Sequence, residues 1–142
     1  MEKYRIFTSK QYRAVVDDMK KTNILGMNCI ENKDIFMLMV ALGLEKPTQL
    51  KNREAMINNT ALGTSDKALI ASVLLGTATD DVQLDEFADL GKSEDLCEQC
   101  AETGYQVLQK KYNDANCDSD LLERRMLNEL KFLFTKNVEA DI

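Results

Sequence analysis

The sequence predicts an all-α fold, a single compact helical domain over residues 1–142, with about six helices around a buried apolar central helix at residues 33–43. One Pro and six Gly among 142 residues leave few positions that break helices. Residues 35–42 are eight apolar residues in succession, and a helix without a polar face must be surrounded by other helices. Apolar residues elsewhere recur three and four positions apart, as on one face of a helix.

The predicted central helix has recognisable ends within residues 33–44. Asn32 is expected to cap its first turn, and Asp34 suits the positive end of the helix dipole. Gly43 is expected to end it in the left-handed conformation, before Pro47 prevents any continuation. The run is too short to cross a bilayer, which needs about 20 apolar residues.

The segments before and after the central helix follow the same spacing rule. A first helix is expected from Thr8 or Ser9 to about Lys21, with an apolar stripe made of Tyr12, Val15, Val16 and Met19. Ile24, Leu25 and Met27 are expected to pack over the core from a loop. Residues 52–59 are interpreted as a short helix with Met56 and Ile57 facing inward.

The second half of the chain predicts four more helices. Residues 66–75, capped by Thr64 or Ser65 and ended by Gly76, form the expected partner of the central helix. A short helix ends near Gly91, and Ser93 caps the next, in which Gly104 permits the close approach of another helix. A turn at residues 113–117 precedes the last helix, residues 119–136, capped by Asp118 or Ser119.

The charge is unevenly distributed along the chain. Residues 1–60 carry ten Lys and Arg against seven Asp and Glu, a net +3, whereas residues 61–142 carry eight against seventeen, a net −9. A total of −6 lacks the electrostatic footprint of a nucleic-acid-binding protein, in which neutralisation of phosphates supplies much of the affinity. The basic N-terminal part could still contact DNA, or the charges could simply form solvated helix faces of differing sign.

Four cysteines raise the question of metal or redox chemistry. Cys97 and Cys100 form a CxxC motif, but they lie in a helical apolar stripe, and Cys29 and Cys117 would have to converge on them to complete a zinc site. Buried core thiols are the favoured interpretation, with metal binding and redox chemistry as alternatives. The N-terminus has no secretory h-region and no stretch resembles a transmembrane helix, so a soluble, cytoplasmic protein with reduced thiols is expected.

The residues that most enzymes require are missing. The chain has no His, which excludes Ser-His-Asp and Cys-His catalysis. The acidic pairs Asp80-Asp81 and Asp85-Glu86 lack the ligand spacing of a calcium loop, so a solvated acidic loop is favoured over a cation site. No glycine-rich phosphate loop is present. We therefore expect a protein that is not an enzyme and that needs no cofactor or metal.

Two stretches resemble a known family. Lys33-Asp-Ile-Phe-Met-Leu-Met-Val-Ala-Leu-Gly-Leu44 is similar to the helix "lysine, acid, apolar run, Ala-Leu-Gly" of Dnd system-associated protein 4, a group of small accessory proteins from bacterial DNA phosphorothioation loci. The order of the later segments also resembles that family. An apolar run, Ala68-Leu-Ile-Ala-Ser-Val-Leu-Leu-Gly-Thr77, is followed by acidic residues and then by Ala101-Glu-Thr-Gly-Tyr-Gln-Val-Leu108. The resemblance covers about residues 10–112 and leaves out residues 119–136.

The resemblance implies a non-catalytic accessory protein of a prokaryotic DNA-modification or restriction system, acting through contacts with protein subunits of that complex. It supplies no catalytic residues. On the residues themselves, the amphipathic last helix is the candidate partner or dimer surface, with a possible homo-oligomer among its outcomes. The alternative is that this helix only closes the core of the domain. The apolar side chains concerned are Leu122, Met126, Leu130 and Phe134.

Two other functions remain open. A nucleic-acid-binding regulator would use the basic N-terminal part, with Lys10, Arg13, Lys20 and Lys21 as candidate contacts. An acidic inhibitor from a phage or plasmid would use the −9 C-terminal part to mimic DNA and block a basic cleft.

Overall fold

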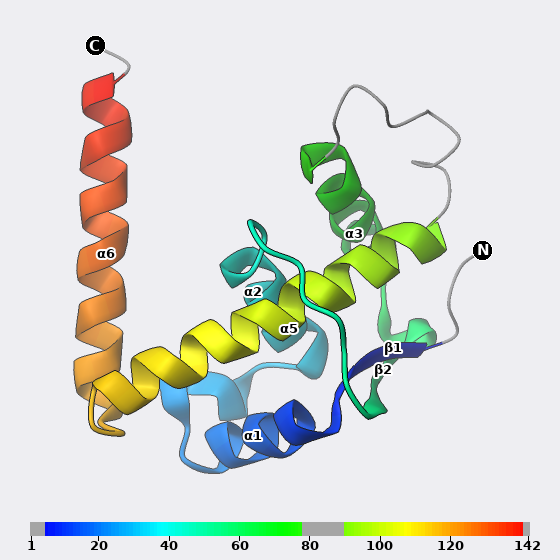
Figure 1. Cartoon of the computed structure of the whole chain (residues 1–142), viewed down its shortest axis with the longest axis horizontal. Coiled ribbons are helices and arrows are strands. Elements are labelled where there is room, and N and C mark those ends of the chain that lie inside the picture. The colour runs from blue at the N-terminus through cyan, green and yellow to red at the C-terminus, as the bar shows by residue number, and fades with distance from the viewer. Residues whose placement is uncertain (1–4, 78–89, 141–142) are drawn as a thin grey trace. The chain divides into compact units, whose positions relative to one another are not determined.

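The computed structural model describes residues 5–77 and 90–140, which are mostly helical with one small two-stranded sheet (Figure 1). The chain divides into two compact units, Met1–Leu108 and Gln109–Ile142, and each is considered by itself. The short helix that was predicted to end near Gly91 falls mostly outside the described residues, as does the acidic stretch at residues 80–86. The elements in order are β1 (Arg5–Ser9), α1 (Lys10–Lys21), the 3-10 helix η1 (Ile24–Cys29), α2 (Asn32–Leu42), β2 (Arg53–Asn58), the 3-10 helix η2 (Asn59–Ala61), α3 (Thr64–Thr77), α5 (Leu90–Asp114) and α6 (Ser119–Ala140).

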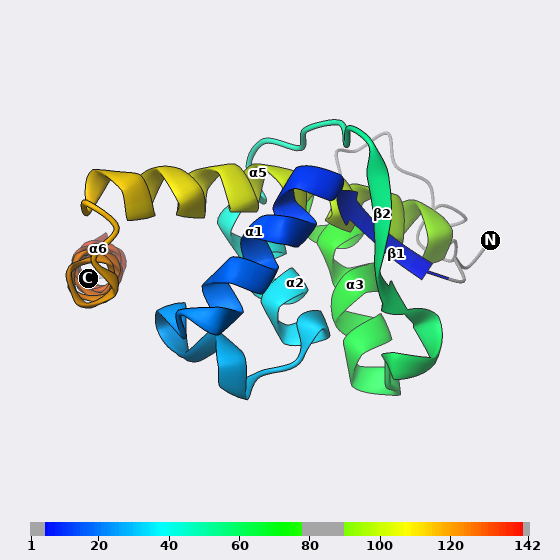
Figure 2. The same ribbon diagram turned by 90° about the horizontal axis from the view of Figure 1, so that it is seen from below.

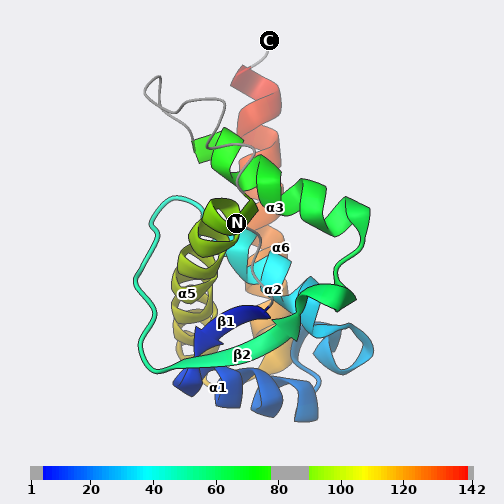
Figure 3. The ribbon, with the colours of Figure 1, turned by 90° about the vertical axis from the view of Figure 1, so that its right-hand side faces the viewer.

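The two-stranded sheet corrects the all-α prediction. Residues 52–59 are not a helix, because β2 pairs antiparallel with β1, as Figure 3 shows. The register shifts between Ile6, opposite Ile57, and Phe7, opposite Ala55, so that one residue of β2 is left over at this bulge. Met56 and Ile57 are consequently both buried although they are adjacent. Two adjacent inward apolar residues do not alternate as in a regular strand, which explains why the sequence favoured a helix.

The N-terminal helix buries three of the four residues of its predicted stripe, and the fourth, Val15, is half-buried. Ser9 occupies the N-cap position of α1, and Tyr12, Val16 and Met19 are buried. The ring of Tyr12 stacks on the ring of Tyr105 from α5, with centroids 5.5 Å apart. Ile24 and Met27 are buried as expected, although η1 presents them rather than an irregular loop.

Helix α2 lies between α1 and α3 (Figures 2 and 3). Its buried side chains are Ile35, Phe36, Met39 and Val40. Ala41 is exposed, so α2 is not enclosed on every side as its composition suggested. Its N-cap is Glu31 rather than Asn32, and the backbone N–H of Glu31 donates to Asp34 Oδ2 at 3.4 Å.

Helices α2 and α5 approach each other at two glycines, as the position of Gly104 predicted. A Cβ atom on Gly104 would overlap the backbone carbonyl of Met39 in α2. A Cβ atom on Gly43 would overlap the carbonyl oxygen of Cys100 and lie 2.6 Å from the backbone nitrogen of Gly104. Gly43 has a φ of −111°, so the prediction of a left-handed helix end is wrong. This glycine is needed for contact with α5, not for a special φ.

Two predicted helix ends also differ from the structure. Gly76 lies inside α3, and Ser93 is a buried residue inside α5 rather than its cap, because α5 already begins at Leu90. The predicted turn before the last helix is confirmed: α5 ends at Asp114, and Asn116 and Cys117 both have a φ of 56°. Asp118 then caps α6, since its Oδ1 accepts from the backbone N–H groups of residues 120 and 121.

Replacing Gly104 by Ala is expected to destabilise the fold by about 2 kcal/mol or more, because the added methyl meets backbone that cannot rotate away. A Gly→Ala change inside a helix without such a contact would stabilise the protein by about 1 kcal/mol. The sign of the change in the free energy of unfolding therefore shows whether the close contact exists. Urea unfolding of wild type and of Gly104→Ala measures the difference in their free energies of unfolding. The matched control is Gly63→Ala, whose Cβ would lie at an ordinary 3.6 Å from Asp66 Oδ2. An unchanged or increased stability of Gly104→Ala would contradict the close helix contact.

Candidate interaction surface

Helix α6 exposes a group of large apolar side chains in the second unit. Leu130 and Phe134, both predicted as partner-surface residues, have 63% and 72% of their area exposed. Of the other two predicted partner-surface residues, Leu122 is buried and Met126 is half-buried, so a partner protein can contact less of their side chains. Three further apolar residues of α6 are exposed but were not among the predicted partner-surface residues: Leu127, Phe132 and Leu133.

A helical projection places all of these exposed side chains except Phe132 on one broad face of α6. With about 100° per residue, Leu127, Leu130 and Phe134 follow one another at spacings of three and four on one side of α6. Leu133 lies beside them, whereas Phe132 lies on the other side of the helix. We call the set Leu127, Leu130, Leu133 and Phe134 the α6 apolar face. The three-four spacing of Leu127, Leu130 and Phe134 is a signal that the sequence already contained.

Charged side chains of α6 form contacts with the end of α5 within the second unit. Lys111 donates from Nζ to both carboxylate oxygens of Glu129 at 2.8 Å, and Arg125 donates to the backbone carbonyl of Asp114 at 3.0 Å. A small cleft of about 120 Å³ lies among these groups, with Leu122 and Met126 on its wall. This side of α6 therefore contacts the end of α5, and the α6 apolar face does not take part.

The candidate nucleic-acid contacts on α1 do not gather into one patch. Lys10 and Lys21 are exposed at opposite ends of the helix, about 16 Å apart at 1.5 Å per residue. Lys20 donates from Nζ to Asn32 Oδ1, and Arg13 is half-buried. Asp17, which is exposed, lies on α1 between the two lysines at its ends.

The CxxC cysteines are core residues. Cys97 and Cys100 are both fully buried, and Cys97 Sγ lies 3.8 Å from the carbonyl oxygen of Ile70 in α3. Burial raises the pKa of the Cys97 thiol to about 12, and the neighbouring Cys100, Glu94 and Glu98 add to this shift; burial likewise raises the pKa of Cys100. Cys29 and Cys117, in contrast, are exposed. In the part of the chain that the structure describes, no three Cys, Asp or Glu side chains are grouped to hold a metal ion.

The four thiols should therefore react in two classes. Cys29 and Cys117 are expected to be alkylated by iodoacetamide in the native protein, while Cys97 and Cys100 react only after unfolding, because they are buried and remain protonated. Mass spectrometry of the labelled peptides at neutral pH, with and without denaturant, distinguishes the classes. Native labelling of Cys97 at the rate of Cys29 would contradict a core position.

Three glutamates on α5 are buried, which the expectation of solvated acidic faces did not foresee. Glu94, Glu98 and Glu102 are at most 3% exposed and follow one another at a spacing of four. Glu98 Oε2 accepts from the backbone N–H of Phe7 in β1 at 2.6 Å, and its Oε1 accepts from the Arg53 guanidinium at 3.1 Å. Carboxylates of the acidic half thus attach the sheet to α5.

Glu102 makes a similar contact one turn further along. Its Oε1 accepts from the Ser9 hydroxyl at 2.8 Å, and Ser9 Oγ accepts in turn from the backbone N–H of Lys51 at 2.9 Å. Burial raises the pKa of the Glu102 carboxyl above its ordinary value, although the Ser9 hydrogen bonds oppose this shift. These contacts fix the end of β1 and the segment before β2, and they are structural.

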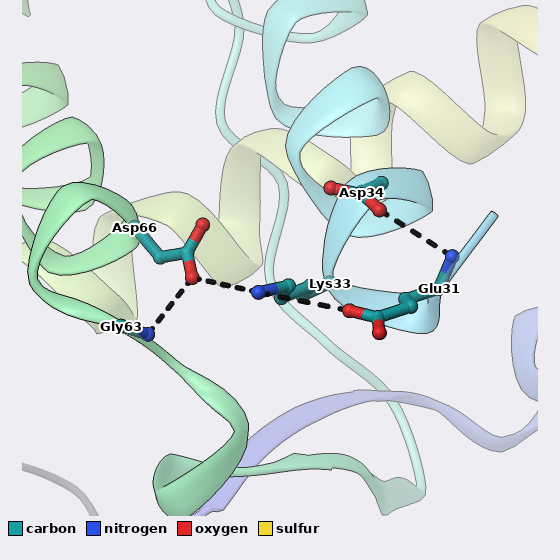
Figure 4. A network of polar contacts seen from close by, with 5 residues as sticks. All are labelled: Glu31, Lys33, Asp34, Gly63 and Asp66. Carbon is teal, nitrogen blue, oxygen red and sulfur yellow. Dashed lines mark hydrogen bonds and ion pairs between the residues drawn. The ribbon is translucent and has the colours of Figure 1, made fainter.

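A charged network joins α2 to α3 (Figure 4). Lys33 Nζ lies 3.0 Å from Asp66 Oδ2 and 3.6 Å from Glu31 Oε2. The backbone N–H of Gly63 donates to Asp66 Oδ2 at 2.9 Å. The Gly63 hydrogen bond, followed by the Lys33 ammonium, lowers the pKa of Asp66, and the hydrogen bond to Asp66 raises the pKa of Lys33.

This network should contribute to stability in a defined pH window. Because the pKa of Asp66 is lower in the folded protein, its contribution is complete above the ordinary value of 3.8 and is lost as the pH falls through the folded-state pKa. Asp66→Asn is therefore expected to lower the free energy of unfolding at pH 7, and its difference from wild type should shrink below about pH 4. Thermal unfolding of wild type and of Asp66→Asn across pH 2–8 measures how their difference in stability depends on pH. The exposed Asp17→Asn is the matched control, and an acid response equal to that of Asp66→Asn would contradict the network.

Two open polar clefts complete the first unit. A cleft of about 250 Å³ is lined by Gln49, Leu50, Arg53, Asp95, Glu98 and Gln99, and one of about 420 Å³ is lined by Glu31, Asn32, Lys33, Met56, Ile57, Asn58, Thr60 and Ala61. The cation in each is already paired with a carboxylate, Arg53 with Glu98 and Lys33 with Asp66. The cations of these clefts are therefore engaged in ion pairs within the fold, and the α6 apolar face is the stronger candidate for function.

Comparisons with protein-family models, curated proteins and solved structures found no match. The resemblance to Dnd system-associated protein 4 therefore stays a prediction. Among the described residues, no helix is both long enough and apolar enough to cross a membrane.

Proposed function

We propose that this protein is a non-catalytic interaction protein of a prokaryotic DNA-modification or restriction system, and that it acts through protein–protein contacts. The observation that carries the proposal is the α6 apolar face, where four large side chains are 51–72% exposed on one helix. Contiguous exposed apolar surface of this kind is typical of sites of protein interaction. The link to DNA modification depends on the resemblance of residues 33–44 and 68–108 to Dnd system-associated protein 4.

The remaining chemistry agrees with a role in binding. The chain has no His, and the buried carboxylates Glu98 and Glu102 accept hydrogen bonds from β1. Arg53, the cation of the cleft at α5, is paired with Glu98 at 3.1 Å. We therefore assign no catalytic residue. We further propose a cytoplasmic location, where DNA-modification systems act and where exposed thiols such as Cys29 remain reduced.

The proposal is tested by affinity purification of the tagged full chain from its host, with nuclease treatment, followed by mass spectrometry. Wild type is expected to recover subunits of a DNA-modification or restriction complex, and Leu130→Asp is expected to reduce that recovery roughly tenfold, since a carboxylate cannot enter an apolar contact without a partner. Asn128→Asp adds the same charge to an exposed residue on the opposite side of α6 and should retain the subunits.

The opposite results are equally informative. If wild type recovers no such subunits, the proposed function is wrong. If every partner disappears with nuclease and binding depends on Lys10 and Lys21, the protein is a nucleic-acid-binding regulator instead.

A further inference from the structure

The second unit has almost no core of its own. Among its described side chains, only Ala115 and Leu122 are fully buried, whereas the α6 apolar face is exposed. Helices in water draw most of their stability from packing an apolar face against a neighbour. A 22-residue helix with such a face therefore requires a covering surface.

The arrangement of charge along α6 restricts what can cover this face. The line of Leu127, Leu130 and Phe134 continues toward the start of the helix with Asp120 and Glu123, at the same spacings of three and four. Parallel pairing of two copies would place each of these acids against its own counterpart, which is unfavourable. Antiparallel pairing separates the like acids to opposite ends of the contact.

We propose that α6 pairs antiparallel with α6 of a second copy of this chain. This inference rests on the proposed function: the second copy is the partner that covers the α6 apolar face, and the dimer is the species that the other subunits bind. In the register that suits the apolar residues, Leu127 of each copy packs against Leu130 of the other, and Met126 packs beside Leu133. Glu123 of each copy then lies level with Phe134 of the other copy and within one helical turn of its Lys131.

The available area is sufficient for a modest dimer. Counting roughly 100 Å² for each side chain of the α6 apolar face and for the half-buried Met126 gives about 500 Å² per copy. An isologous contact uses the same face twice, so the total is about 1,000 Å², the size at which specific interfaces begin. The second copy is also a partner whose complementary apolar surface is already known, because it is the same face.

Sedimentation equilibrium of the purified full chain, under reducing conditions and up to high micromolar concentration, tests the proposal. Wild type is expected to dimerise, and Leu130→Asp is expected to weaken the dimer roughly tenfold or more without changing the far-UV circular dichroism. Asn128→Asp, on the other side of α6, should dimerise like wild type. A monomeric wild type, or a dimer that Leu130→Asp leaves intact, would overturn the proposal. So would a monomer that cosediments with phosphatidylglycerol vesicles, since lipid would then cover the face.

A disulfide experiment tests the direction of pairing in a background in which the exposed Cys29 and Cys117 are replaced by Ser. Chains with Leu127→Cys and chains with Leu130→Cys, carrying tags of different size, are oxidised separately and as a mixture. Antiparallel pairing predicts a cross-linked heterodimer in the mixture and little cross-linking of either variant alone. Cross-linking of each variant alone, with none between them, would overturn the antiparallel arrangement. A monomeric wild type that still recovers DNA-modification subunits would remove the dimer while retaining the proposed function.

Discussion

The first unit depends on the backbone contact between α2 and α5. Gly104 lies against the carbonyl of Met39, and Gly43 lies against the carbonyl of Cys100, so neither helix has a side chain between them at these points. Such a contact is possible only if both positions are Gly, and it places Phe36 and Met39 on one helix and Tyr105 and Leu108 on the other in the buried core. Tyr105 then stacks on Tyr12, which brings α1 to the same core.

The sheet is attached to this pair of helices by polar contacts as well as by apolar packing. Two strands alone are marginally stable in water, and β1 needs partners beyond β2. Glu98 accepts the N–H of Phe7, and Glu102 accepts the hydroxyl of Ser9, so α5 supplies acceptors along β1. A buried carboxylate is costly unless it is hydrogen-bonded, and the contacts of Glu98 with both Phe7 and Arg53 meet that requirement. These glutamates therefore count toward the fold although they belong to the most acidic part of the chain.

Local periodicity predicted the features that a single helix determines by itself. The stripe of Tyr12, Val16 and Met19, the turn before α6 and the small residue at the helix contact all follow from spacing within one segment. The strand β2 could not be predicted, because its state depends on β1 nearly fifty residues earlier and a bulge hides its alternation. The burial of Glu98 and Glu102 escaped for the same reason, since their acceptor role exists only once β1 lies beside α5.

The candidate surface shows the same limit within one helix. Leu122 and Leu130 are both apolar residues of α6 and belong to one predicted stripe, yet Leu122 is 1% exposed and Leu130 is 63% exposed. The stripe is therefore divided by face: Leu122 lies on the side of α6 near the end of α5, where Lys111 and Glu129 also pair, whereas Leu130, the residue next to Glu129, lies outside that contact. The exposed face and the acids that precede Leu127 are the features on which the proposed antiparallel pairing depends.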